Sequence, residues 1–512
     1  MLNQFSIKSK AGFTNYFHNA HGSSLALTLS ELALQQDSLL VVMLPDASQA
    51  MSLSKEVEFF LGDKSELPVI ILPDWETLPY DYFSPHQDII SERLRTLYQL
   101  PNLNKGILLL PVTSAVQKLT NKSYIQQHCL SLELQQKLDT QVFVTQLVEA
   151  GYTNVSKVIE HGEYAVRGSI IDLFPMGTDF PVRVELFDDE IESIRLFDCD
   201  SQLTTKKIEQ FNLLPAKEYP TNEKAIAQFR QSWRSKFDTN IKDSPIYKDV
   251  SNGVFPAGIE YYLPLFFESL SHIFDYLESK DSLILVTEDI DKAIESFWHD
   301  LNERYEQHRH DLERPILSPS ELYLSKQELR SRIKDYAQIE ISHHTETKSK
   351  SSTSLNYSAC ENVSVEHKSK EPLNNFIRAV DQDYKILICA ESPGRQEVIR
   401  ELMTKNQVSL SICNNWNEYL TSPESISLTV APLSRGFKWK NHLIVCESDL
   451  FGKQVLQRKH LDTKALSPDQ LIHSLAELKI GDPVVHIEQG IGAGATSRMR
   501  RRRSAAERRQ WR

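Results

Sequence analysis

The stretch Leu39-Leu-Val-Val-Met-Leu44 decides the fold class of this 512-residue chain. It is apolar at every position, as is Ile107–Val112, and a polar segment suited to start a helix follows each run. A shorter third run covers Val69–Leu72. Strands without polar alternation are buried on both faces, which is typical of a parallel sheet covered by helices. The first 120 residues or so therefore predict a parallel α/β sheet.

A helix is predicted between two of these runs. Ser84-Pro85 provides a favoured N-cap residue followed by proline at the first helical position. The stripe that follows at helical spacing consists of Ile90, Leu94, Leu97 and Tyr98. One apolar face at this spacing indicates a helix that packs against the sheet.

The pattern changes between residues 125 and 212, where a small inserted α+β domain is predicted. Leu130–Ala150 is interpreted as a helix, and Pro181–Phe187 alternates strictly between apolar and other side chains. Asp188-Asp189 makes a turn, and Ile191–Phe197 returns as the second strand of a hairpin. A strict period of two predicts that Val182, Val184 and Leu186 face the core and that Arg183, Glu185 and Phe187 face outward.

Downstream of the insertion, the sequence returns to mixed α/β character. The predicted strands are Leu283–Val286, Lys385–Ala390, Leu443–Cys446 and a first strand in Gly481–Ile487. One helix is predicted directly after Leu283–Val286, a second over Arg395–Lys405, and a short third one near Pro468–Leu478. Residues 343–371 are rich in Ser, Lys and Glu with almost no apolar period, which predicts a linker.

Composition places the chain among cytosolic globular proteins. Apolar residues make up 40% and charged residues 25%, the formal net charge is −12, and no apolar run approaches the ~20 residues that span a bilayer. The six cysteines form no C-x-x-C pair or tight cluster, so no zinc site is expected. The pair His343-His344 lies in the predicted linker and is interpreted as solvated.

Motifs for catalysis are missing from the sequence. No G-x-x-x-x-G-K-[ST] string occurs, and its nearest counterpart, Asn19–Leu25, contains one glycine and no lysine to neutralise phosphate. The chain also lacks G-x-S-x-G and H-E-x-x-H, and the carboxylates near Asp188 are interpreted as a solvated turn. We therefore expect no catalytic residue, no bound cofactor, no metal site and no ATP hydrolysis by this chain.

Two interpretations of the outward face of the hairpin remain open at this point. Arg183 and Phe187 together on a solvated strand are typical of interface anchors. An ordinary charged surface strand would show the same pattern.

Longer motifs resemble one family. They are Asp74-Trp-Glu-Thr-Leu-Pro-Tyr-Asp81, Ser84-Pro-His-Gln-Asp-Ile-Ile90, Glu160-His-Gly-Glu-Tyr-Ala-Val-Arg-Gly168, Asp172-Leu-Phe-Pro175, Phe187-Asp-Asp-Glu190 and Glu447-Ser-Asp-Leu450. They resemble the bacterial transcription-repair-coupling factor family, Mfd, over about residues 10–492. The resemblance implies a module similar to the repair protein UvrB, with a RecA-type α/β domain whose P-loop is degenerate.

The resemblance also implies partners and site residues. Arg167 and Arg183 match the arginines with which the family contacts UvrA, and Phe187 lies beside them on the predicted face. RNA polymerase, double-stranded DNA, ATP and magnesium are implied only for full-length members, in which an ATP-driven DNA translocase would lie beyond residue 492. The chain is thus expected to be a UvrA-recruiting module for transcription-coupled nucleotide excision repair, located in the cytoplasm.

The expected domain organisation combines the pattern with the resemblance. It comprises 1–124, the first part of a UvrB-like α/β domain; 125–212, the inserted UvrA-binding domain; 213–342, the second part of the α/β domain; 343–371, the linker; 372–455, a small α/β domain; 456–492, a linker and the start of an RNA-polymerase-interacting domain; and 493–512, an Arg-rich tail.

The tail departs from the family. Residues 498–512 contain eight arginines and one glutamate, with no apolar period that could complete a fold. A frameshift or premature stop is the favoured origin, and an evolved nucleic-acid-binding tail is the alternative.

Overall fold

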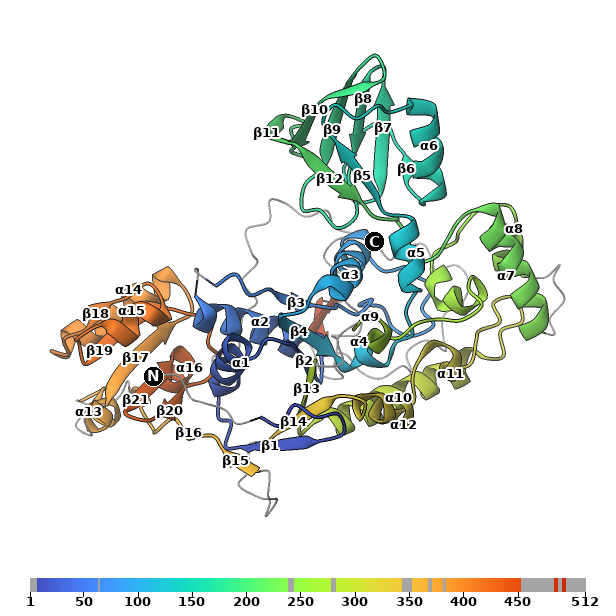
Figure 1. Cartoon of the computed structure of the whole chain (residues 1–512). Helices are drawn as coiled ribbons and strands as arrows, with labels where there is room; N and C mark the ends of the chain where they lie inside the picture. Colours follow the sequence, from blue (N-terminus) through green and yellow to red (C-terminus); the bar gives the residue numbers. More distant parts are fainter. Residues whose placement is uncertain are drawn as a thin grey trace.

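The structure is a computed structural model. It describes residues 7–62, 65–237, 244–277, 282–342, 352–366, 371–380 and 384–452, together with the backbone of 483–486 and 490–493. The chain forms three units: the first lies in the middle of the view, the second stands out above it, and the third lies to its left (Figure 1). The architecture is mixed α/β with several sheets, two of which are wholly or largely parallel.

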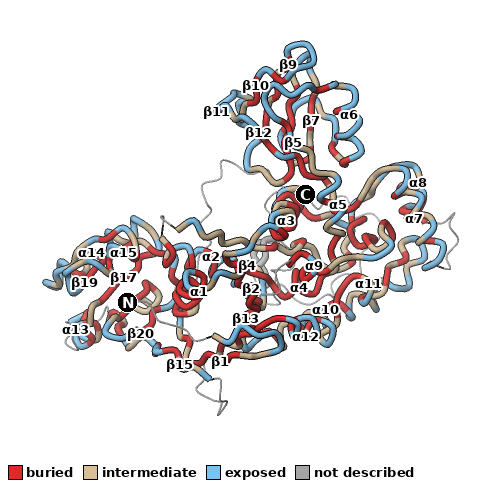
Figure 2. Tube along the Cα trace, viewed as in Figure 1, coloured by how far each residue is buried: buried red, intermediate tan, exposed pale blue. Residues whose placement is uncertain are grey.

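The first unit is built on a seven-stranded parallel sheet, which confirms the predicted class. Its strands in spatial order are β15 (Ser352–Ser354), β1 (Thr14–His18), β14 (Ala337–Ser342), β13 (Leu283–Thr287), β2 (Leu39–Leu44), β4 (Gly106–Pro111) and β3 (Val69–Ile71). Every residue of β2 and β4 is buried, as expected for strands covered on both faces (Figure 2).

Helices cover both faces of this sheet and extend the unit to one side. They are α1 (Ser24–Gln35), α2 (Ala47–Leu61), α3 (Gln87–Gln99), η1 (Leu100–Asn102), α4 (Val112–Val116), α5 (Lys122–Gln127), α7 (Glu223–Lys236), α8 (Pro245–Ser251), η2 (Ile259–Leu265), α9 (Ile273–Tyr276), α10 (Ile290–His308), α11 (Pro319–Leu322) and α12 (Lys326–Ile333).

The predicted start of α3 is wrong by two residues. The helix begins at Gln87, and the ring of His86 accepts the N–H of Asp88 as its cap. Ser84 does not cap the helix because its hydroxyl donates to Glu260, 2.7 Å away, and accepts the N–H of Gly258. A tertiary contact therefore overrides the local capping signal. The apolar stripe is confirmed, since Ile90, Leu94 and Leu97 are buried and Tyr98 is partly buried against the same core.

The second unit is inserted between α5 and α7. Its six-stranded sheet has the order β11 (Thr204–Ile208), β10 (Glu190–Phe197), β9 (Val182–Phe187), β8 (Ile170–Leu173), β7 (Glu163–Arg167) and β6 (Thr153–Asn154). A two-stranded ribbon of β5 (Leu130–Glu133) and β12 (Gln210–Leu213) joins it to the first unit, and α6 (Thr140–Glu149) covers one sheet face.

The predicted single helix over Leu130–Ala150 is wrong in its first half. Residues 130–133 form β5, which pairs with β12, and the helix α6 begins only at Thr140. Asp139 sets this start, because its carboxylate accepts the N–H groups of Gln141 and Val142.

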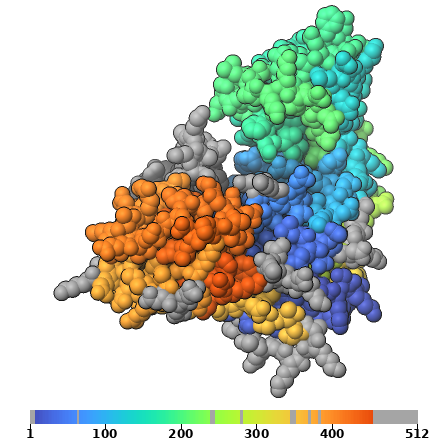
Figure 3. All heavy atoms as spheres, turned by 60° about the vertical axis from the view of Figure 1, so that its left-hand side comes forward, coloured from blue at the N-terminus to red at the C-terminus, as the bar shows by residue number. Residues whose placement is uncertain are grey.

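The third unit has a six-stranded sheet in the order β16 (Tyr357–Ala359), β20 (Phe437–Trp439), β21 (His442–Cys446), β17 (Lys385–Ala390), β19 (Ile426–Val430) and β18 (Ser411–Ile412). Its helices are α13 (Asn374–Val380), α14 (Pro393–Lys405), α15 (Trp416–Thr421) and α16 (Glu447–Phe451). It packs directly against the first unit, as the space-filling view shows (Figure 3).

Within the linker predicted over 343–371, the structure describes two short strands. Residues 352–354 form β15, which adds to the first sheet beside β1, and residues 357–359 form β16, which pairs with β20 of the third unit. Short polar strands at sheet edges carry no apolar period, so composition did not reveal them. His343-His344 lies outside the described residues.

The final described strands form a separate ribbon of β22 (Pro483–His486) and β23 (Gly490–Ala493). The first of them confirms the strand predicted in Gly481–Ile487. The short helix near Pro468–Leu478 and the Arg-rich tail from residue 494 onward lie outside the described residues.

Candidate functional site

The hairpin β9–β10 has the alternation that its sequence predicts. Val182, Val184 and Leu186 are buried in the core, while Phe187 is 68% exposed at the end of β9. Asp188 occupies the turn in a left-handed conformation, with φ of 54°. Phe143 and Leu147 of α6 belong to the same core cluster as Val182 and Val184, so the other side of the sheet faces outward.

Asp172 on β8 organises this outward face. Its carboxylate is 1% exposed and accepts two bonds from Arg183, Nε to Oδ1 at 2.7 Å and Nη2 to Oδ2 at 3.0 Å. Arg167 donates to the same Oδ2 atom from 3.0 Å. A buried carboxylate thus holds both arginines in fixed positions by charge-assisted bonds.

The two arginines are not equally available to a partner. The Arg183 side chain is only 18% exposed, its guanidinium lies over the ring of Phe197 at 5.1 Å, and the bond to Asp172 raises its pKa above the ordinary value. The Arg167 side chain is 53% exposed. The sequence predicted Arg183 as an outward-facing interface anchor, whereas the structure shows its guanidinium bonded to Asp172.

The strand register shows that the three predicted site residues share one face. Arg167 pairs with Ile170 across β7–β8, Ile170 pairs with Glu185 across β8–β9, and Phe187 lies two residues beyond Glu185. We call this side of the sheet, defined by Arg167, Arg183 and Phe187, the docking face.

The register also extends the docking face to residues that sequence reasoning missed. Arg183 is opposite Arg195 on β10, and Arg195 is opposite Lys207 on β11. Like charges directly opposite one another across strands destabilise a sheet. Arg195 is paired with Glu185 at 3.3 Å, whereas Lys207 has no ion pair within the described part of the chain. Asp172 and Glu185 thus neutralise the two arginines of the row, and Lys207 is exposed on β11.

The sequence contained a weak signal for this row. Thr204–Ile208 combines β-branched residues with two lysines, as exposed edge strands often do. The pairing of Lys207 with Arg195 depends on irregular registers on both sides of β10, which no period in the sequence encodes.

Contacts with α3 fix the orientation of the inserted unit. Asp88 bonds the ring of His161 at 2.7 Å, the N–H of Gly177 donates to Ser91 at 2.8 Å, and Arg95 pairs with Asp179 at 2.7 Å. The bonds from His161 and His86 lower the pKa of Asp88 below its usual range. The unit is therefore held by polar contacts on its α3 side. Arg167 and Phe187 of the docking face are exposed, whereas Arg183 donates to the carbonyl of Gln202 and lies on a small buried cluster that contains Phe197.

Comparisons with known proteins identify two of the units. Residues 130–219 match the UvrB interaction domain, and residues 376–450 match the D3 domain of MFD. The chain is 38% identical over 501 residues to the transcription-repair-coupling factor of Escherichia coli and 40% identical over 473 residues to that of Haemophilus influenzae.

This chain is a relative of the transcription-repair-coupling factors.

The aligned region makes up most of this chain but less than half of each relative. The alignments cover 96% and 91% of the chain, but 43% and 41% of the Escherichia coli and Haemophilus influenzae transcription-repair-coupling factors. The chain therefore spans about two fifths of the length of these relatives. The UvrB interaction domain match encloses all of β5–β12, and with them the docking face.

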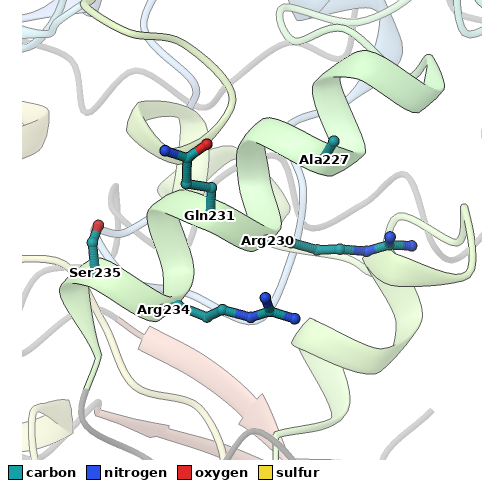
Figure 4. Close-up of a pocket in the computed structure, with 5 residues that line it drawn as sticks. All are labelled: Ala227, Arg230, Gln231, Arg234 and Ser235. Atoms are coloured by element: carbon teal, nitrogen blue, oxygen red, sulfur yellow. The ribbon is translucent and has the colours of Figure 1, made fainter.

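Two arginines on α7 line a hollow outside the inserted unit. A hollow of about 610 Å³ lies on α7, where Arg230 and Arg234 extend from one side of the helix toward α8 (Figure 4). Arg230 donates to the carbonyl of Ser251 and Arg234 donates to the hydroxyl of Tyr247, so both guanidinium groups join the two helices.

Two absences also hold for the described residues. No group of three or more His, Cys, Asp or Glu side chains is placed there to hold a metal ion. None of the helices in the described ranges is both long and apolar enough to cross a bilayer.

Proposed function

We propose that this chain recruits UvrA through the docking face of its inserted domain, as part of transcription-coupled nucleotide excision repair. The observation that carries this proposal is Phe187, a large apolar side chain that is 68% exposed on the same face as two arginines held by one buried carboxylate. An exposed aromatic on a face that also carries fixed cations is typical of an interface anchor. The match to the UvrB interaction domain supports the same partner.

The roles of the two arginines differ in this proposal. Arg167 contacts UvrA directly, because more than half of its side chain is exposed. Arg183 is held by Asp172 over the ring of Phe197 and donates to the carbonyl of Gln202, and it offers its remaining N–H groups to the partner. Because Arg167 and Phe187 are exposed in the described chain, the chain binds UvrA constitutively and competes with UvrB.

The first unit is proposed to be a UvrB-like RecA-type domain that has lost its nucleotide site. Asn19–Leu25 lacks the lysine of a working P-loop, so the chain binds no ATP or magnesium and is no enzyme by itself. ATP-driven translocation on DNA and displacement of stalled RNA polymerase are proposed for full-length relatives only. The cytoplasm, where these partners occur, is the proposed location.

The deciding experiment is a titration of UvrA with the purified chain by calorimetry. Phe187→Ala is expected to weaken binding by about thirtyfold, since an anchor contributes ~2 kcal/mol. Val148→Ala is the matched control, because Val148 is also well exposed but lies on α6, away from the docking face. Circular dichroism confirms that each variant is folded. Equal affinity of Phe187→Ala and the parent would show that the hairpin is ordinary surface.

A further inference from the structure

The turn between β1 and α1 receives a loop from the third unit. Gly22 has φ of 55°, and the N–H of Ser23 donates to the carbonyl oxygen of Arg435 at 2.9 Å. The Ser23 hydroxyl accepts the N–H groups of Ser434 and Arg435 at 3.2 and 3.4 Å. Ser23 is fully buried by these contacts. One serine therefore satisfies both a carbonyl and the amides of the incoming main chain.

The approach of the two backbones leaves no room for a side chain at residue 22. A Cβ atom on Gly22 would lie 2.5 Å from the carbonyl oxygen of Gly436 and 2.7 Å from that of Arg435. Only glycine avoids this overlap and also adopts the left-handed conformation without strain. The single glycine of Asn19–Leu25 is thus explained by the loop that it contacts.

Glu56 on α2 forms a second wall of the same site. Its Oε1 atom accepts the N–H of Ser434 at 2.9 Å, and its side chain is buried in the chain interior. Burial raises the pKa of the Glu56 carboxyl above its ordinary value. The acidic side chain of Glu56 and the hydroxyl of Ser23 both accept main-chain N–H groups here, which makes the space unfavourable for phosphate and favourable for a peptide.

Hydrogen bonds within the third unit fix the conformation of the loop at residues 433–436. Asp449 accepts the N–H groups of Gly436 and Cys446 at 2.7 and 2.9 Å, and the hydroxyl of Ser448 donates to the carbonyl of Ser434 at 2.8 Å. A segment already fixed in its bound conformation loses little entropy on docking.

Apolar contacts surround the polar ones. Phe60 of α2 meets the ring of Trp416 edge to face at 5.0 Å and that of Phe437 at 6.3 Å. These side chains belong to one core cluster that includes residues of both the first and the third unit. Leu433 and Gly436 of the docked loop are buried beside this cluster, whereas Ser434 and Arg435 are exposed at the surface.

We propose that the β1–α1 turn is a peptide-binding site whose ligand is the main chain of residues 433–436 of the same chain. In nucleotide-binding α/β domains, the N–H groups at such a turn bind phosphate. Here a carbonyl oxygen takes that place, and the loop excludes a phosphate ligand. The site fastens the third unit to the first.

Hydrogen exchange measured by mass spectrometry on the full chain tests this site. Gly22→Ala is expected to accelerate exchange of the amides of residues 434–436 by at least about tenfold, because the overlap forces the loop away. Gly253→Ala is the matched control: Gly253 has φ of 78° and no atom within 4 Å of its added Cβ, so only the conformational strain is shared. The control is expected to leave exchange in 434–436 unchanged.

Ser23→Ala provides a second variant that removes only the hydroxyl acceptor, in case Gly22→Ala does not fold. It should accelerate exchange of the same amides, with circular dichroism like that of the parent. Millimolar inorganic pyrophosphate should leave the parent's exchange in 434–436 unaltered. Parent-like protection in a folded Gly22→Ala or Ser23→Ala variant would overturn the proposal, as would loss of protection on adding pyrophosphate.

Discussion

Replacing Asp172 by asparagine tests whether one buried carboxylate holds the docking face together. The substitution keeps the shape of the side chain and removes its charge. Oδ2 accepts from both Arg167 and Arg183, and Oδ1 accepts from Arg183, so the amide nitrogen must face at least one guanidinium donor in either orientation. At least one charge-assisted bond and the attraction to both cations are lost.

The expected cost follows from the burial of the partners. Removing one member of a fully buried ion pair costs about 3–5 kcal/mol, and one hydrogen bond to a charged group contributes about 1.5–3 kcal/mol. The arginine side chains are 53% and 18% exposed, so water compensates part of the loss. We expect Asp172→Asn to destabilise the inserted unit by ~2 kcal/mol, or about thirtyfold in its opening equilibrium.

Hydrogen exchange of the amides in β7–β10 measures this opening without assuming that the whole chain unfolds in one step. Exchange there should be about thirtyfold faster in Asp172→Asn. Glu185→Gln is the control, because Glu185 lies on the same face but its pair with Arg195 is partly exposed and contributes little. Equal exchange in Asp172→Asn and Glu185→Gln would refute the reasoning.

Three further predictions concern charges. Lys207→Glu should weaken UvrA binding by roughly threefold to tenfold at low salt. Lys206→Glu, the same charge change on the other side of β11, should leave binding unchanged. Equal effects of the two variants in the titration would show that the row of cations takes no part in binding. Asp88→Asn should lower the thermal unfolding temperature relative to the parent above about pH 4. The difference should vanish as the pH falls below this value, because a depressed pKa of Asp88 stabilises the folded state only where the carboxyl of the unfolded chain is ionised. Glu218→Gln should cost about 3 kcal/mol in urea unfolding followed by tryptophan fluorescence, since it strands the fully buried Arg93; a parent-like midpoint would contradict this.

Sequence periodicity was sufficient to predict a strand and its buried side wherever one face or both faces of that strand are buried. The run at residues 39–44 became β2 without change of bounds, and the alternation at 181–187 placed Phe187 on the surface. In both cases the burial of apolar side chains contributes most to the local stability of the strand. The period of these side chains is visible in the sequence of that strand alone.

Features that depend on two distant segments could not be predicted in this way. The bond from Ser84 to Glu260 displaced the start of α3, and the fork of Arg183 on Asp172 requires the β8–β9 register. The docking of Ser434 on Ser23 joins residues more than 400 positions apart. Each is a polar contact between single side chains or amides, for which sequence patterns provide no period.

The ribbon β5–β12 has a consequence for the order in which the chain folds. Leu130 and Leu213 are paired partners, so the inserted unit leaves and rejoins the first unit at neighbouring points. Closing a flexible loop of about 80 residues costs on the order of 4 kcal/mol in chain entropy. If the insertion folds by itself, this ribbon holds its two ends close together. The later pairing of β13 with β2 then closes a much shorter effective loop. The insertion then acts as a clasp that speeds assembly of the parallel sheet, and unfolding it should slow the sheet's formation as well.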